Sequence, residues 1–99
     1  MPKTHELPIP GPAQLEESAR ELVRVWAAGG AQHVTLAAGL WKDPAAWGIV
    51  LADLARHVAA AYQQSYGLVR EDVLIRIREA FDAEWGHPTD TPGPQAPMK

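Results

Sequence analysis

Apolar positions follow a helical period near the start of the chain. Between residues 13 and 28 they recur every third or fourth residue, as at Leu15, Leu22 and Trp26, with charged residues off that stripe. The segment Gly29–Gly30 follows, and glycine readily adopts the positive φ that closes a helix. The pattern therefore predicts an amphipathic helix over residues 13–28.

The next apolar stretch alternates and predicts a β-strand over residues 32–38. Alternation places His33 and Thr35 on one face of this strand, and Val34 and Leu36 on the other. A single strand leaves its backbone donors and acceptors without partners, so a second strand must pair with it.

Three alternative segments can pair with this strand. The N-terminal segment 6–9 can form an edge strand, since prolines are tolerated at a sheet edge. The chain can also return through Leu40 and Trp41, or the same strand of another chain can pair across a two-fold axis. We favour local pairing with segment 6–9 together with pairing between two copies.

Two further helices are predicted in the second half of the chain. Asp43 followed by Pro44 is a typical helix start, and Gly67 is a typical stop, which predicts a helix to Tyr66. This helix has a large apolar face and, beside it, a stripe of small residues that allows another backbone to approach closely: Gly48, Ala52, Ala55 and Ala59.

The last helix is expected over residues 70–85, where Leu74, Ile77, Phe81 and Trp85 share one face. Gly86 and Pro88 end it. We expect most of the tryptophans, Trp85 included, to pack in the core.

The fold class expected from these elements is α+β. Three helices pack on a small antiparallel sheet in the order (β)αβαα, and homodimerisation completes the sheet. Proline clusters at both ends delimit an N-terminal extended segment, residues 1–12, a single domain, residues 13–86, and a disordered tail, residues 87–99.

Composition excludes several function classes. The 99 residues carry 9 Lys and Arg against 12 Asp and Glu, and the net charge of -3 argues against binding to nucleic acid or to an anionic membrane. Cysteine is absent, so there is no thiolate nucleophile and no cysteine metal site. No segment looks like an export signal or a membrane span, and we expect a small soluble cytoplasmic protein without a cofactor.

A family resemblance extends over nearly the whole chain. It rests on the following residues: Trp41, Asp43, Pro44, Trp47, Gly48, Leu54, His57, Val58, Ala61, Tyr62, Arg76, Ile77, Glu79, Phe81 and Trp85. In these positions the sequence resembles a family of small bacterial proteins known only as domain of unknown function 5076. The resemblance implies a free-standing bacterial single-domain protein and carries over no activity.

The sharpest candidate for chemistry is the pair Asp53 and His57. The two residues are one helical turn apart, where a carboxylate can orient an imidazole for general-base work. The plainer interpretation, which we favour, is a half-buried histidine satisfied by a carboxylate, so no catalytic residue is assigned. The four histidines lie 24 to 30 residues apart along the chain, and we expect no metal site.

Four residues are candidates for a binding surface. Trp41 precedes the long helix, where it packs on the first turn or, if exposed, marks a contact surface. His33 and Thr35 are candidates for the contact between two copies, and Arg56 for ligand or partner binding.

We therefore expect a non-enzymatic interaction or regulatory module that acts as a homodimer. Binding of a further protein partner is compatible with this expectation. The alternative is a small-ligand-binding protein or enzyme that uses Asp53, Arg56 and His57 beside Trp41 or Trp47. That alternative requires these side chains to converge on a concave, partly apolar pocket.

Overall fold

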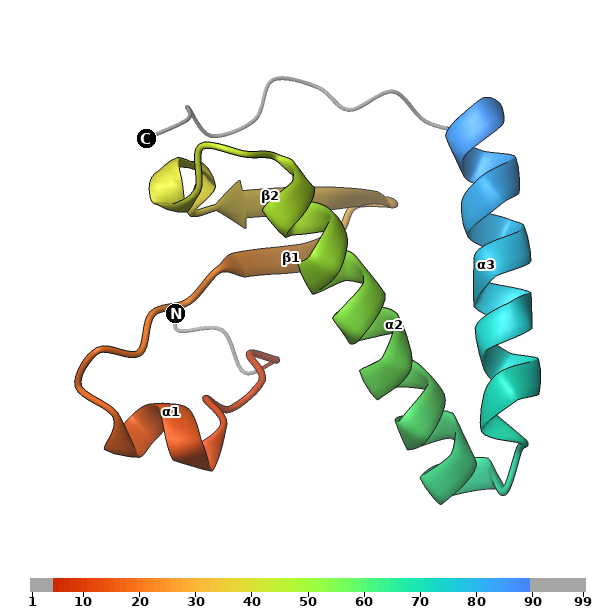
Figure 1. Cartoon of the computed structure of the whole chain (residues 1–99), viewed down its shortest axis with the longest axis horizontal. Helices are drawn as coiled ribbons and strands as arrows, with labels where there is room; N and C mark the ends of the chain where they lie inside the picture. The colour runs from red at the N-terminus through yellow and green to blue at the C-terminus, as the bar shows by residue number, and fades with distance from the viewer. Residues whose placement is uncertain (1–4, 90–99) are drawn as a thin grey trace. The chain divides into compact units, whose positions relative to one another are not determined.

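The computed structural model describes residues 5–89, which form two compact parts, residues 5–39 and residues 40–89. The first part contains the short helix α1 (Gly11–Leu15) and two strands, β1 (Val23–Ala28) and β2 (Ala31–Leu36). A single 3-10 turn, Ala38–Leu40, follows. The second part contains the helices α2 (Ala45–Tyr66) and α3 (Arg70–Gly86). Figure 1 labels these elements.

The expected α+β class is confirmed, with three helices and a two-stranded antiparallel sheet. The predicted helix over residues 13–28 is wrong for most of its length. Only Gly11–Leu15 is helical, and Val23–Ala28 is a strand. The β-branched residues Val23 and Val25 alternate with Arg24 and Trp26, so this stretch also fits the period of a strand.

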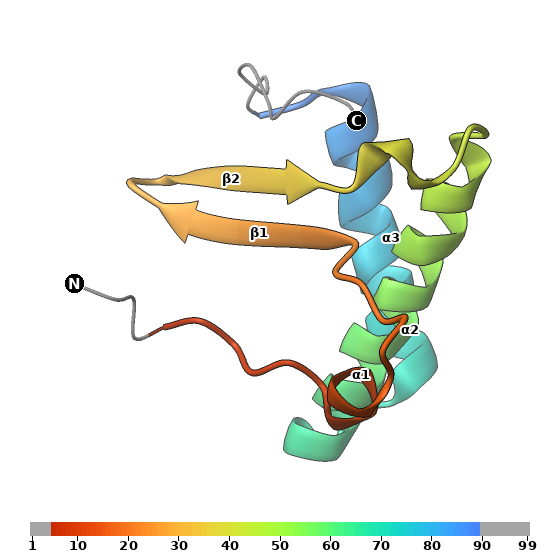
Figure 2. The same ribbon diagram turned by 90° about the vertical axis from the view of Figure 1, so that its left-hand side faces the viewer.

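The partner of the predicted strand is therefore β1, and neither segment 6–9 nor the return through Leu40 and Trp41 pairs with it. Gly29 and Gly30 form the two-residue turn between β1 and β2, with φ of 61° and 79°. Positive φ at both positions is the signature of the hairpin turn whose twist matches the strands. Figure 2 shows the resulting hairpin.

The register of the hairpin separates its two faces. Val25 lies opposite Val34 on one face, and Trp26 lies opposite His33 on the other. The expected alternation within β2 is thus present. The strand ends at Leu36 rather than at residue 38, because the 3-10 turn begins at Ala38.

Helix α2 begins and ends where its terminal residues predict. The Asp43 carboxylate accepts a hydrogen bond from the Ala45 N–H at 2.9 Å, and Gly67 closes the helix with φ of 70°. Helix α3 carries Glu71 and Asp72 in its first turn, where they complement the helix dipole.

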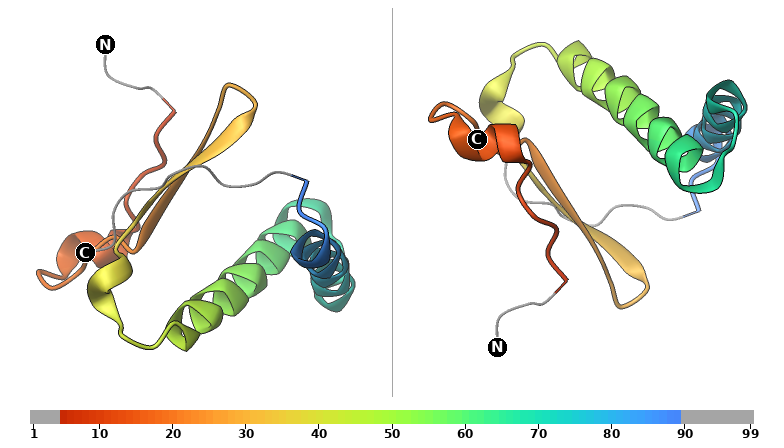
Figure 3. Two further views of the ribbon diagram at one scale, coloured as in Figure 1. Left: turned by 90° about the horizontal axis from the view of Figure 1, so that it is seen from above. Right: turned by 90° about the horizontal axis from the view of Figure 1, so that it is seen from below.

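Helices α2 and α3 meet near the connection over residues 67–69 and diverge away from it (Figures 1 and 3). Ala59, on the small-residue stripe of α2, is fully buried. It is the one buried residue among residues 40–89, and none is buried among residues 5–39. Neither part encloses a core of large side chains by itself.

The expected domain boundaries at residues 12 and 86 stay a prediction. Residues 90–99, most of the expected disordered tail, lie outside the described residues. Across residues 5–89, no helix has the length and apolar character needed to cross a membrane.

Candidate functional site

In the second part, a groove with a volume of about 820 Å³ lies between α2 and α3. It opens where the helices diverge, between the first half of α2 and the second half of α3. The α3 wall is built from large apolar side chains that share one helical face: Leu74, Ile77, Phe81 and Trp85. Phe81 and Trp85 stack with ring centroids 5.5 Å apart and an interplanar angle of 23°.

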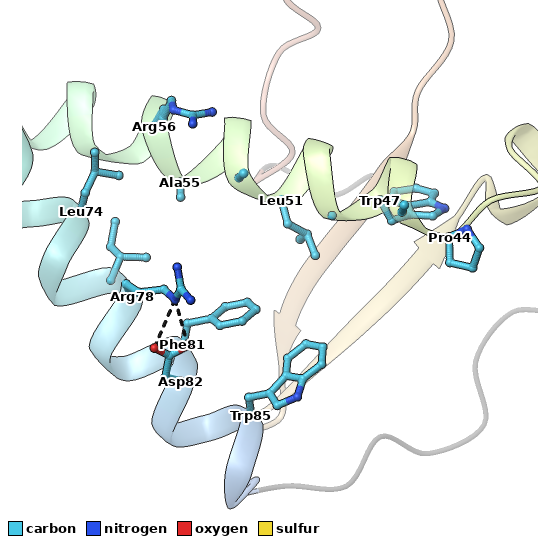
Figure 4. A pocket seen from close by; sticks show the side chains of 14 residues that line it. Pro44, Trp47, Leu51, Ala55, Arg56, Leu74, Arg78, Phe81, Asp82 and Trp85 are labelled. Atoms are coloured by element: carbon cyan, nitrogen blue, oxygen red, sulfur yellow. Dashed lines mark hydrogen bonds and ion pairs between the residues drawn. The ribbon is translucent and has the colours of Figure 1, made fainter.

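The α2 wall of this groove mixes small and large side chains. Gly48, Ala52 and Ala55 line it together with Trp47 and Leu51. Figure 4 shows the Phe81 and Trp85 rings extending beneath α2, on the side to which Leu51 points. Small residues of α2 therefore face the groove beside Trp47 and Leu51, and large apolar side chains of α3 line its other wall.

Much of this apolar lining is open to solvent. Trp85 is 78% exposed, and Phe81 and Leu51 are nearly half exposed. The expectation that Trp85 packs in the core is therefore wrong for the isolated chain. Single exposed apolar residues are common on protein surfaces. A contiguous exposed apolar patch is unusual and is typical of a contact surface.

Charged side chains line the groove from both helices. Arg78 on α3 donates a hydrogen bond from Nε to an Asp82 carboxylate oxygen at 3.0 Å, and both side chains are mainly exposed. On α2, Arg56 pairs with Asp53 at 3.0 Å. In Figure 4 the Arg56 guanidinium lies on the opposite side of the α2 ribbon from Leu51.

Asp53 and His57 are not brought together. Asp53 pairs with Arg56 instead, and His57 is exposed without an ion pair or hydrogen bond to Asp53 in the described part of the chain. Arg56 lines the groove, whereas Asp53 and His57 do not. On an ideal helix the His57 side chain projects about 160° away from that of the buried Ala59.

Trp41 lies against the start of α2. Its ring meets that of Trp47 edge to face, with centroids 5.4 Å apart and an interplanar angle of 75°. Trp41 is 37% exposed, so it packs on the helix and still presents part of its surface.

His33 and Thr35 lie two residues apart on one face of the hairpin. Thr35 contributes to a shallow hollow of about 380 Å³ beside Arg24, and the His33 Nε2 lies 3.1 Å from the Ala28 carbonyl oxygen. The Glu21 carboxylate, followed by that of Glu6, raises the pKa of Arg24 above its usual value. The guanidinium is already charged at neutral pH, so these carboxylates only strengthen its charged form.

Metal-binding clusters are not found among residues 5–89, where no three His, Asp or Glu side chains gather. The residues that sequence reasoning missed are Arg78, Phe81, Asp82 and Trp85. The signal for Phe81 and Trp85 was the apolar face of α3, which we interpreted as core, because periodicity shows which residues share a face but not whether that face is covered.

Comparisons with known proteins identify a family and a similar solved structure. None of the curated proteins matches the chain. Among solved structures, the chain is similar to one described as "a putative pyruvate dehydrogenase from the photosynthetic bacterium Rhodopseudomonas palustrus CGA009". The two chains are 30% identical, the match covers 99% of this chain and 100% of the other, and the TM-score is 0.73. The family model described as Domain of unknown function (DUF5076) matches residues 6–89, and the chain belongs to that family.

Proposed function

We propose that this protein is a non-enzymatic interaction module that acts as a homodimer. The observation that supports the proposal is the groove between α2 and α3. Its aromatic wall is exposed, while only Ala59 is buried among residues 40–89. A chain of this size has little hydrophobic stabilisation to spare, so an apolar surface left in water is a strong driving force for association.

The balance of charges in the groove also supports protein association. Arg78 and Asp82 line the groove as an ion pair and Arg56 lines it from α2, so the apolar lining is bordered by both signs of charge. An apolar centre with a polar rim of mixed charge is typical of protein interfaces. A strongly charged ligand would instead favour a border of one sign.

One observation supports the alternative, a small-ligand-binding protein. The volume of the groove falls within the range of ligand pockets. The groove lacks the chemistry that was expected. Arg56 reaches the groove without Asp53 or His57. The three residues therefore do not converge on one pocket, and the interaction module is the better supported function.

The proposal is tested by measuring the mass of the full chain by light scattering over a range of concentrations. The expected mass is twice the 10.8 kDa of one chain. A mass of one chain at every concentration, from a folded sample, contradicts the proposal.

A further inference from the structure

We infer that the groove between α2 and α3 receives the α3 helix of a second copy of this chain, with Arg78 of each copy facing Asp82 of the other across a two-fold axis. This inference rests on the proposed homodimer and names its interface. Three features of the groove argue for a second copy as its occupant: the shapes of the two walls, the arrangement of charge and the apolar area available.

The shape of the groove is self-complementary. Small residues, Ala52 and Ala55 among them, line the α2 wall, and the α3 wall carries Phe81 and Trp85. In a two-fold contact, the surface that offers large side chains also offers the hollow that receives them. Each copy then places its aromatic residues against the small residues that line α2 of the other copy.

The charges are self-complementary in the same way. Arg78 and Asp82 lie one helical turn apart on the groove side of α3 and already pair within the chain at 3.0 Å. When two identical helices cross antiparallel over this turn, each arginine meets the aspartate of the other copy. A two-fold axis thus creates two attractive contacts from Arg78 and Asp82 alone. An unrelated partner would need its own acidic residue for Arg78 and its own basic residue for Asp82.

The exposed aromatic side chains supply about a third to a half of the area that a stable interface needs. A stable interface buries at least about 600 Å² on each partner. An aromatic side chain supplies about 150–250 Å², so Trp85 at 78% exposed and Phe81 at 44% exposed supply about 200–300 Å². Leu51, 49% exposed, and the aliphatic stems of the bordering arginines add to this area.

The test uses two charge variants of the full chain, first separately and then mixed. Arg78→Glu places two carboxylates opposite each other at both contacts, and Asp82→Arg places two guanidinium groups there. Because like charges across an interface are strongly unfavourable, each variant alone should raise the dimer dissociation constant about tenfold or more. An equimolar mixture should regain the dimer, because the opposite charges introduced at positions 78 and 82 meet across the two-fold axis.

Arg76→Glu is the matched control. Arg76 also forms an ion pair within α3, with Glu79 at 3.3 Å, but neither residue lines the groove. This variant should dimerise as the parent does. A loss of helix stability caused by breaking any α3 ion pair would appear equally in the control and would not be repaired by mixing.

The outcomes distinguish failure of the proposed interface from failure of the proposed homodimer. If both charge variants dimerise as tightly as the parent, or if mixing restores nothing, the interface is wrong while a dimeric parent leaves the proposed function intact. If the parent itself is monomeric by light scattering, the proposed function fails first. Association lost in each variant, kept in Arg76→Glu and regained in the mixture supports the interface.

Discussion

Trp41 and Trp47 pack edge to face at the start of α2, with ring centroids 5.4 Å apart. This contact ties the segment that leads into the helix to its first turn. We expect Trp41→Ala to lower the free energy of unfolding by about 1–2 kcal/mol, because both the aromatic pair and its apolar area are lost. Urea titration followed by circular dichroism measures the change. Trp41→Phe keeps a ring in place and should recover part of the loss; equal stability of all three proteins would contradict a role for this contact.

The Asp43 side chain caps α2. Its carboxylate accepts the Ala45 N–H at 2.9 Å, so Asp43→Ala leaves that donor without its partner. We expect a loss of about 1 kcal/mol, the usual effect of removing a helix cap, and near-parent stability for Asp43→Asn. Thermal denaturation of both variants provides the measurement. A drop of the same size in both would point to charge rather than to the hydrogen bond.

The β1–β2 turn requires positive φ at two successive residues, Gly29 and Gly30. A side chain that disfavours this conformation should open the hairpin, and Gly29→Val is expected to destabilise it by about 1–2 kcal/mol. Asparagine tolerates positive φ at the first position of such a turn, so Gly29→Asn is the control and should be nearly neutral. Cross-strand contacts between Val25 and Val34 in NMR spectra report the hairpin directly. Their persistence at full strength in Gly29→Val would refute this account of the turn.

Ala59 on α2 is the one fully buried residue among residues 40–89. Ala59→Leu inserts a larger side chain between the helices, and overpacking of this kind costs about 1–3 kcal/mol. Ala61→Leu, two residues away at an exposed position, makes the same chemical change without that penalty. The comparison is made by guanidinium denaturation. If both variants lose the same stability, Ala59 does not set the helix packing.

The long helix could be predicted almost to the residue, because its signals are local. Asp43 with Pro44 begins α2 and Gly67 ends it, and no distant contact is needed for either effect. The segment before Gly29 could not be assigned in this way. Its apolar residues fit both a helical and an alternating period, and the two glycines serve as a helix stop or as a hairpin turn. Pairing with β2 decides between them, and pairing is a property of the fold.

The candidate site was predictable only in part. The close approach expected along the small-residue stripe is present only at its end, where Ala59 is buried, whereas Gly48 and Ala52 are exposed. The stripe did not indicate that α3 diverges from α2 and leaves Phe81 and Trp85 exposed on its inner face. The angle between α2 and α3 depends on the connection between them and on the contacts of the groove. The apolar periodicity of a single helix does not predict that angle.

The most direct test of the account is an isotope-filtered NMR measurement on a mixture of labelled and unlabelled protein, which detects only contacts between different copies. The account predicts contacts from the Trp85 ring of one copy to the methyl groups of Ala52 and Ala55 of the other. If the Trp85 ring shows contacts only within its own chain, the groove is not the surface through which two copies associate, and the central claim is contradicted.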